Sequence, residues 1–259
     1  MNLPQQDIAH VHEFSPMRDF MGKKVFVYGL GWFGSWLVDS LQAYGTRVIG
    51  KGSKQPLPTN HFDYAIYAAS GGTKEFLDFV ETLEIPKCLY ISSGAIYNRT
   101  DDYAVRKLAD EKLCGEHPAN PVIARCFTFV GPRQPLDAQW AVGNFFADAI
   151  AARDIKVRGD GKAVRSYMHM ADLMVWLLTL LVKGTPGKPY NVGSEEAVSI
   201  EKLATMVARL SGCRVVIEGK PCESNLYVPQ TFSAKALGLS VRIPLYESLQ
   251  RTWRWLNKP

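Results

Sequence analysis

The sequence has none of the cysteine patterns that mark disulfide-rich or zinc-binding proteins. Its five cysteines are odd in number and form no Cys-x-x-Cys pair, so neither a disulfide framework nor a zinc cluster is expected. No long hydrophobic run is present either, since the longest, 173–182, is far shorter than the roughly 20 residues that cross a bilayer. The N-terminus does not carry a basic region followed by an apolar core, the pattern of a signal peptide. These absences favour a soluble cytoplasmic protein with no metal site and no membrane partner.

The chain also has no cluster of basic residues. Its formal net charge is +5, and because the lysines and arginines are scattered, nucleic acid is not the expected partner. Small anionic ligands such as nucleotide phosphates fit this charge as well. With 259 residues, of which 47% are hydrophobic, the chain can build one large domain or a domain with a smaller lobe.

A strand, a glycine-rich turn and a helix follow one another near the N-terminus. The apolar stretch 23–28 predicts a strand, and the turn 29–34 has the pattern Gly-x-Gly-x-x-Gly before an amphipathic helix. Such glycines let the backbone approach a pyrophosphate at the helix N-terminus. We therefore predict a dinucleotide site, the alternative being a merely tight strand–helix turn. The predicted cofactor contacts are Gly29, Gly31, Trp32, Phe33 and Gly34 and, after the third predicted strand, the small residues Ala68 and Ala69.

The end of the second predicted strand, 46–50, bears on the choice of cofactor. An NAD site usually presents a carboxylate to the ribose 2′-hydroxyl here, whereas the 2′-phosphate of NADP calls for a cation. The sequence supplies Lys51, Ser53 and Lys54 and no carboxylate. This composition favours NADP(H) over NAD(H), the alternative being that the lysines belong to a solvated loop.

Predicted strands and helices alternate along most of the chain, which is typical of a parallel doubly wound sheet. We therefore expect an α/β, Rossmann-like fold with a smaller C-terminal substrate-binding lobe. The predicted dinucleotide-binding domain spans 23–135, with a strand near 189–193 returning to it. Residues 136–259 are expected to form mainly the lobe.

The first 22 residues show no sustained periodicity and are expected to be an N-terminal extension. His10 and His12 lie in this segment. We interpret them as incidental residues of a flexible tail, the alternative being a metal-binding pair.

The candidate catalytic residues come from one strand and from the helix that follows it. The apolar run 88–91 predicts a buried strand that ends at Ser92 and Ser93. Tyr103 and Lys107 are four residues apart in a segment of helical periodicity, so both side chains leave the same helix face. The alternative is an ordinary surface pair, since many exposed residues have this spacing. A neighbouring ammonium favours the phenolate, so Tyr103 could exchange a proton with a carbinol or carbonyl oxygen while Ser93 donates a hydrogen bond to it. The trio suits hydride transfer at a C–OH/C=O carbon.

Together, these motifs resemble those of the extended short-chain dehydrogenase/reductases of the NAD-dependent epimerase/dehydratase family, the nucleotide-sugar enzymes. The resemblance runs from about 23 to 255. It implies the Rossmann-like fold, an NAD(P) cofactor, a nucleotide-sugar substrate and a homodimer that pairs through helices beside the sheet. Besides the glycine turn and Tyr103-x-x-x-Lys107, the segments that carry it are 91–97, 125–133, 159–173, 190–193 and 227–229.

The resemblance also implies roles for single residues. Ser93 and Tyr103 match groups that contact the reacting sugar oxygen, and Lys107 matches one that also holds the nicotinamide ribose. Asn144 and Arg165 match positions that bind the nucleotide diphosphate, a contact that guanidinium geometry favours; the alternative for Arg165 is a surface ion pair. The full set that matches substrate-binding positions is Ser93, Thr128, Asn144 and Arg165.

Three departures from the family pattern bear on the substrate. The link between Ser93 and Tyr103 is short, so the loop over the sugar is cut down. The segment before Ala68 and Ala69 is also short and leaves out the piece that usually flanks the adenine. Residues 94–95 are Gly-Ala, where the 4,6-dehydratases of the family have the Asp-Glu pair that eliminates water, which argues against dehydration.

These features predict an NAD(P)-dependent oxidoreductase that reduces a nucleotide-linked keto-sugar with Tyr103 as the proton donor. The alternative is a nucleotide-sugar epimerase with tightly bound NAD, which uses the same groups to oxidise and re-reduce one carbon. A third hypothesis is a catalytically silent cofactor-binding protein. The shortened loops permit it, whereas the intact trio of Ser93, Tyr103 and Lys107 speaks against it.

Overall fold

The computed structural model describes residues 2–136, 140–219 and 225–258, so Cys222 lies outside the described residues. The chain divides into two compact units. Unit 1 consists of Met1–Cys126, Ala171–Val192 and Thr231–Ser240, and unit 2 of Phe127–Met170, Gly193–Gln230 and Val241–Pro259. Unit 1 thus contains residues 23–126 of the predicted domain 23–135, the predicted extension 1–22 and two later segments, the first of which includes the strand expected near 189–193.

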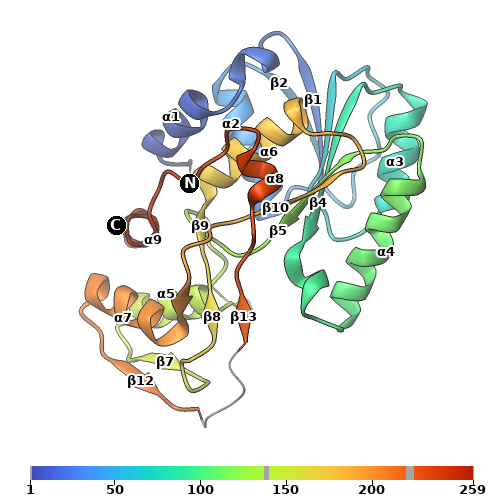
Figure 1. The fold of residues 1–259 in the computed structure, drawn as a ribbon. Helices are drawn as coiled ribbons and strands as arrows, with labels where there is room; N and C mark the ends of the chain where they lie inside the picture. Colours follow the sequence, from blue (N-terminus) through green and yellow to red (C-terminus); the bar gives the residue numbers. More distant parts are fainter. Residues whose placement is uncertain (1, 137–139, 220–224, 259) are drawn as a thin grey trace. The chain divides into compact units, whose positions relative to one another are not determined.

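Unit 1 is built on a six-stranded sheet in the order β10-β5-β4-β3-β1-β2, in which all neighbours pair in parallel (Figure 1). Its central strands are buried on both faces, as helices on both sides of a parallel sheet require. The edge strand β2 is partly exposed instead. The strands are β1 (Lys24–Tyr28), β2 (Arg47–Lys51), β3 (Tyr64–Tyr67), β4 (Lys87–Ser93), β5 (Val122–Cys126) and β10 (Pro189–Val192).

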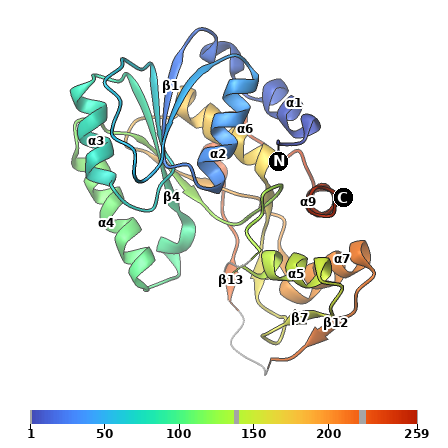
Figure 2. The same cartoon turned by 180° about the vertical axis from the view of Figure 1, so that it is seen from behind.

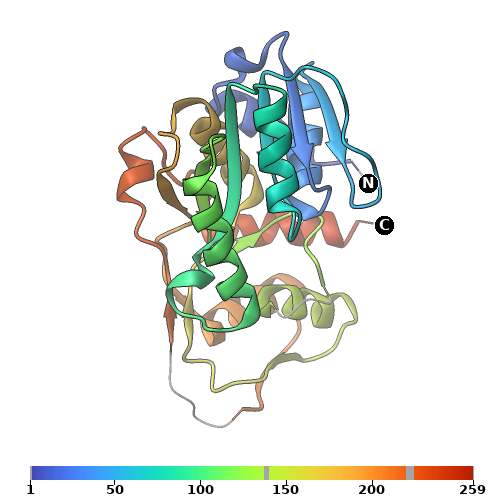
Figure 3. The ribbon, with the colours of Figure 1, turned by 90° about the vertical axis from the view of Figure 1, so that its right-hand side faces the viewer.

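Helices cover both faces of this sheet. α2 (Trp32–Ala43) and α6 (Met170–Lys183) lie on one face, and α3 (Thr73–Thr82) and α4 (Asp102–Glu116) lie on the other (Figures 1 and 2). Figure 3 shows α3 and α4 side by side in front of the sheet. The predicted doubly wound α/β fold is therefore confirmed. The short helix α8 (Phe232–Lys235) packs beside β10.

The strand order creates a switch point between β1 and β3. The chain runs from β1 outward to β2 and then returns to β3 on the other side of β1. In doubly wound sheets, ligands bind outside the carboxyl ends of the strands at such a point. The other common order, 3-2-1-4-5-6, has a further strand beyond β2, whereas β2 is the edge here. The strand that the described residues lack beyond β2 corresponds to the short segment between β2 and β3, and β3 ends just before Ala68 and Ala69.

The expectation of a flexible N-terminal tail is wrong. Residues 5–14 form the helix α1 (Gln5–Phe14), which packs on α2. His10 Nε2 lies 2.8 Å from Asp172 Oδ1, and His12 Nε2 lies 2.9 Å from the Ser40 carbonyl oxygen. Both histidines therefore attach the segment to the rest of unit 1. A 3₁₀-helix, η1 (Met17–Phe20), follows, and the apolar side chains buried by the segment are Leu3, Val11, Met17 and Phe20.

Unit 2 has its own hydrophobic core, to which the helices α5, α7 and α9 contribute aromatic and aliphatic side chains such as Phe145, Phe146 and Leu249. In the described part of this unit, short strands form one three-stranded sheet and two two-stranded sheets. None of the helices among the described residues is both long and apolar enough to span a membrane. The elements are β6 (Phe129–Val130), α5 (Ala141–Ile150), β7 (Ile155–Val157), β8 (Val164–Arg165), β9 (Met168–His169), β11 (Val198–Ser199), α7 (Ile200–Ser211), β12 (Val215–Ile217), β13 (Leu226–Tyr227) and α9 (Leu245–Leu256).

Candidate active site

The glycine turn after β1 forms a cradle in which two positions, Gly29 and Gly34, accept only glycine. Gly29 has a φ of +101°, and a Cβ there would lie 2.7 Å from the Ala68 carbonyl oxygen; a Cβ at Gly34 would lie 1.8 Å from the Gly29 carbonyl oxygen. Gly31 is the N-cap of α2 and, as a glycine, makes no side-chain cap hydrogen bond to that helix. The N-terminus of a helix that begins in this way can bind an anion such as a pyrophosphate. Next to the cradle lie the predicted contacts Trp32 and Phe33, whose rings are 5.7 Å apart, and Ala69.

The three polar residues predicted at the end of β2 differ in their surroundings. The Lys51 side chain is only 6% exposed; its ammonium lies 4.6 Å from the centroid of the Tyr28 ring and 4.0 Å from Glu75 Oε2. The Tyr28 hydroxyl donates to the same carboxylate. Ser53 and Lys54 are exposed. Lys51 is thus a buried residue at the end of the strand. Lys54, by contrast, is a solvated lysine in the loop that follows.

Ser93 is the last residue of β4 and is largely buried, with 8% of its surface exposed. Its Oγ accepts a hydrogen bond of 3.2 Å from the Ala95 N–H, which caps the 3₁₀-helix η2 (Gly94–Tyr97). This bond occupies an oxygen lone pair and leaves the hydroxyl proton for donation. Gly94 and Ala95 are buried and provide no carboxylate beside it.

Tyr103 lies in the first turn of α4 and is partly exposed. Its ring centroid lies 5.7 Å from the Arg99 guanidinium carbon and 5.9 Å from that of Arg106. Asp101 caps the helix, and its Oδ1 accepts a 3.0 Å bond from the Ala104 N–H. Tyr103, the predicted proton donor, therefore lies next to the capped end of α4 and between two guanidinium groups.

Lys107 is buried, with 3% of its surface exposed. Its Nζ donates to Tyr90 Oη at 3.2 Å and to the Ile91 carbonyl oxygen at 3.1 Å. Among the described residues it forms no hydrogen bond to Tyr103, so the two predicted partners share a helix without direct pairing here. Burial away from water lowers the pKa of Lys107, and the nearby Asp110 carboxylate offsets part of that effect.

Sequence reasoning missed a ladder of tyrosines across three strands. Tyr28, Tyr67 and Tyr90 are register partners on β1, β3 and β4. Their rings stack with centroid distances of 5.5 and 4.7 Å and interplanar angles of 19° and 17°. The ammonium of Lys51 lies over one end of the ladder and that of Lys107 over the other. A tyrosine in each of three predicted strands is the signal that could have revealed it.

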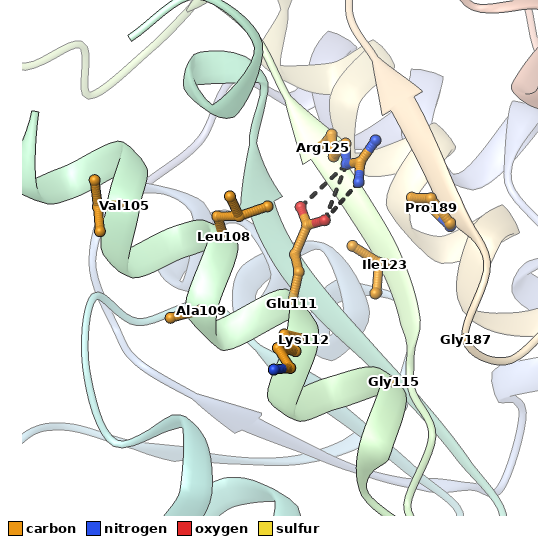
Figure 4. Close-up of a pocket in the computed structure, with 10 residues that line it drawn as sticks. All are labelled: Val105, Leu108, Ala109, Glu111, Lys112, Gly115, Ile123, Arg125, Gly187 and Pro189. Atoms are coloured by element: carbon orange, nitrogen blue, oxygen red, sulfur yellow. Dashed lines mark hydrogen bonds and ion pairs between the residues drawn. The ribbon is translucent and has the colours of Figure 1, made fainter. Parts of the chain in front are cut away.

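A second missed network lies behind Ser93. Arg125 donates from Nε and Nη2 to the Glu111 carboxylate over 2.6 to 3.1 Å (Figure 4). It also donates from Nη1 to Tyr97 Oη at 2.6 Å. The Ser92 hydroxyl also donates to Glu111. Burial disfavours the charge of Arg125, but the hydrogen bond to Glu111, the charge of that carboxylate and the bond to Tyr97 together outweigh burial and raise the pKa of Arg125. The network holds the end of β4 and the η2 turn together.

The three remaining predicted substrate residues lie in unit 2. The Thr128 hydroxyl donates to the Ser166 carbonyl oxygen. Arg165 Nη1 donates to the carbonyl oxygens of Val164 at 2.8 Å and Asn225 at 3.1 Å, and no ion pair of Arg165 is found among the described residues. The surface ion pair considered as an alternative for Arg165 is therefore absent from that part of the chain. Asn144 is a partly exposed residue of α5.

Comparison with known proteins places the chain in a family. A model described as the NAD dependent epimerase/dehydratase family matches residues 56–193, more than half of the chain. UDP-glucuronic acid decarboxylase 1 of Arabidopsis thaliana is 36% identical over 99 residues, which are 38% of this chain but only 22% of that protein. The match therefore spans less than a quarter of the relative's length.

Solved structures share the fold. RMD from Pseudomonas aeruginosa, complexed with NADPH, has a TM-score of 0.77 at 22% identity, and the match covers 90% of this chain and 98% of that one. UDP-glucuronic acid 4-epimerase from Bacillus cereus, in complex with NAD, has a TM-score of 0.76 at 20% identity with the same coverage of 90% and 98%. Since the family model matches more than half of the chain and its fold is that of these structures, the protein belongs to the NAD-dependent epimerase/dehydratase family.

Proposed function

We propose that the protein is an NAD(P)-dependent oxidoreductase that acts on a nucleotide-linked sugar and reduces a keto group. The observation that carries this proposal is the buried Lys107 ammonium, which is bonded to the Ile91 carbonyl oxygen two residues before Ser93 and lies one helical turn after Tyr103. These groups belong to the carboxyl end of β4 and to the helix that follows it. The glycine cradle at the switch point fits a dinucleotide.

Each of the three groups has a definite task in such a reduction. NAD(P)H, when bound, supplies the hydride. Tyr103 donates its proton to the carbonyl oxygen as that oxygen becomes a hydroxyl. Ser93 donates a hydrogen bond to the same oxygen, since the Ala95 N–H already occupies its acceptor side. The Lys107 ammonium stabilises the phenolate that Tyr103 leaves behind.

Besides Ser93, the proposed substrate contacts lie in unit 2. Thr128, Asn144 and Arg165 are the proposed contacts, the last two with the diphosphate. Arg165 commits only Nη1 to the described carbonyl oxygens, which leaves Nε and Nη2 for a phosphate. Gly94 and Ala95 supply no acid and base for loss of water, which supports reduction over dehydration.

For the cofactor we propose NADP(H), with the 2′-phosphate bound by Ser53 and Lys54. Both side chains are exposed after β2 and have no carboxylate in the adjoining sequence 51–54. Lys51 is reassigned from this role, because its ammonium is already engaged by Tyr28 and Glu75. The structural neighbour RMD was solved with NADPH, in agreement with this choice.

The test is oxidation of NADPH by the purified protein in the presence of nucleotide-linked 4-keto-6-deoxy sugars. We expect turnover with at least one of them, and we expect Tyr103→Phe to abolish turnover while sparing NADPH binding. A protein that leaves NADPH unoxidised with every such sugar, or a Tyr103→Phe variant with full activity, would contradict the proposal.

The second candidate is a nucleotide-sugar epimerase, favoured by the likeness to the Bacillus cereus 4-epimerase. It would oxidise and re-reduce one carbon with the same Ser93, Tyr103 and Lys107. NAD⁺ that stays bound through purification, together with interconversion of two sugar nucleotides without net use of cofactor, would identify it.

We also propose a homodimer that forms through the outer face of α4. Val105 and Leu108 on this helix are 59% and 56% exposed, and they line a shallow groove of about 570 Å³ beside β5 and β10 (Figure 4). Exposed apolar side chains that share a face favour association. Sedimentation should show a dimer for the unaltered protein and a monomer for Leu108→Lys; a monomer in both cases would exclude the proposal.

A further inference from the structure

We propose that Tyr90 is a positioning residue for the Lys107 ammonium and that Asp110 fixes the Tyr90 hydroxyl in the orientation this requires. The inference rests on the proposed function, in which Lys107 assists the proton transfer from Tyr103. It adds to that function two residues, Tyr90 and Asp110, that hold the Lys107 ammonium in place.

The hydrogen bonds run in one direction through the three side chains. Lys107 Nζ donates to Tyr90 Oη at 3.2 Å, and Tyr90 Oη donates to Asp110 Oδ2 at 2.9 Å. A tyrosine hydroxyl has a single proton. Because that proton is given to the Asp110 carboxylate, the oxygen lone pairs face Lys107 and stabilise its charged form.

The Tyr90 ring cannot easily move away from this position. Tyr90 is fully buried and stacks on Tyr67, with centroids 4.7 Å apart and ring planes 17° apart. The Lys107 ammonium lies 4.8 Å from the centroid of the Tyr90 ring and 3.1 Å from the Ile91 carbonyl oxygen. Two fixed acceptors on β4 therefore define where the ammonium lies relative to Ser93, at the end of the same strand.

The charge of Lys107 depends on these partners, because burial opposes it. Burial lowers the pKa of Lys107, and the Asp110 carboxylate works against that effect. Burial also strongly raises the pKa of Tyr90, so its hydroxyl stays protonated and remains a donor to Asp110. The charged and titratable groups that face Lys107 are Arg106, Asp110 and Cys114 on α4, Tyr67 on β3, Tyr90 on β4 and Cys126 on β5.

Three variants of the full chain isolate the Tyr90 hydroxyl. Tyr90→Phe keeps the stacked ring and removes only the hydroxyl. Asp110→Asn keeps an acceptor for that hydroxyl and removes the charge at a partly exposed position. Tyr67→Phe is the matched control, since Tyr67 is equally buried and stacked but its hydroxyl bonds to Thr73 and not to Lys107.

The first measurement is an NMR titration of lysine labelled with carbon-13 at Cε, with Lys107→Met to assign the signal. We expect Lys107 to lose its proton at a lower pH in Tyr90→Phe and in Asp110→Asn than in the unaltered protein, and to titrate unchanged in Tyr67→Phe. The inference is overturned if Tyr90→Phe titrates like the unaltered protein. It is also overturned if Tyr67→Phe shifts as much as Tyr90→Phe, since general loosening would then explain both.

The second measurement is the pH dependence of NADPH oxidation. Activity should fall as pH rises through the pKa of Lys107, and this limb should move to lower pH in Tyr90→Phe, with kcat/KM lowered about tenfold, as expected for the loss of one hydrogen bond to a charged group. Absence of turnover in the unaltered protein would refute the proposed function, while the titration would still decide the role of Tyr90. Turnover with an unchanged Lys107 titration would refute the inference and leave the function standing.

Discussion

The ion pair between Glu111 and Arg125 should contribute measurably to the stability of unit 1. Breaking a buried pair by removing one partner typically costs about 3–5 kcal/mol, because the other charge stays buried without compensation. The Glu111 side chain is 6% exposed and that of Arg125 is 19% exposed. Since water reaches the guanidinium in part, we expect Glu111→Ala to lower the free energy of unfolding by about 3 kcal/mol, the lower end of this range. Ser92 loses its hydrogen-bond acceptor in the same variant.

Urea unfolding followed by circular dichroism measures this loss. Lys112→Ala is the control, because its ammonium is 3.8 Å from Glu116 Oε1 in a pair whose side chains are 77% and 65% exposed. Exposed pairs of this kind contribute at most about 0.5 kcal/mol. If Glu111→Ala loses no more than Lys112→Ala, the reasoning that assigns the network a structural role behind β4 is refuted.

Three further predictions concern the glycine cradle, the choice of cofactor and the cap of α4. Gly34→Ala should destabilise the protein by roughly 1–3 kcal/mol in urea unfolding and abolish cofactor binding in a fluorescence titration, because its Cβ meets the Gly29 carbonyl oxygen; normal binding would exclude the cradle. Lys54→Gln should weaken NADPH binding about tenfold with little effect on NADH binding, because it removes a charge-assisted contact. Lys51→Met should leave the preference between NADPH and NADH unchanged. The reverse pattern in the same titration would show that Lys51 is the cation that selects NADPH. The Ala104 N–H bonds to Asp101 and lowers its pKa, so Asp101 stabilises the fold above its ordinary pKa of 3.8 and loses this effect as pH falls further. Thermal unfolding of Asp101→Asn should lack that acid-dependent loss, and an identical pH dependence in both proteins would contradict it.

The fold was predictable where short-range patterns determine it. The apolar runs of β3 and β4, the glycine turn and the alternation of strands with helices are local features, and each led to the observed parallel sheet. The helix α1 was not predicted, because its residues are mostly polar and only Val11 in it is a buried apolar side chain. Its attachment depends on bonds to Asp172 and Ser40, residues far along the chain that a sequence window does not reach.

The candidate site was predictable in its residue types but not in its contacts. Helical spacing placed Tyr103 and Lys107 on one helix, and the structure confirms that helix. Spacing does not say which acceptor a long lysine side chain reaches, and here Tyr90 on the neighbouring strand provides it. The same holds for Lys51, whose position at the end of β2 was expected but whose burial over the Tyr28 ring depends on tertiary packing.

Transfer of deuterium from cofactor to sugar tests the central claim most directly. NADPH deuterated at the transferring position of the nicotinamide is incubated with the unaltered protein and each nucleotide-linked keto-sugar, and the product is analysed by mass spectrometry. The account predicts a sugar nucleotide with one deuterium on the newly formed carbinol carbon, and none with Tyr103→Phe. A product without deuterium, or no product with any keto-sugar, would contradict it.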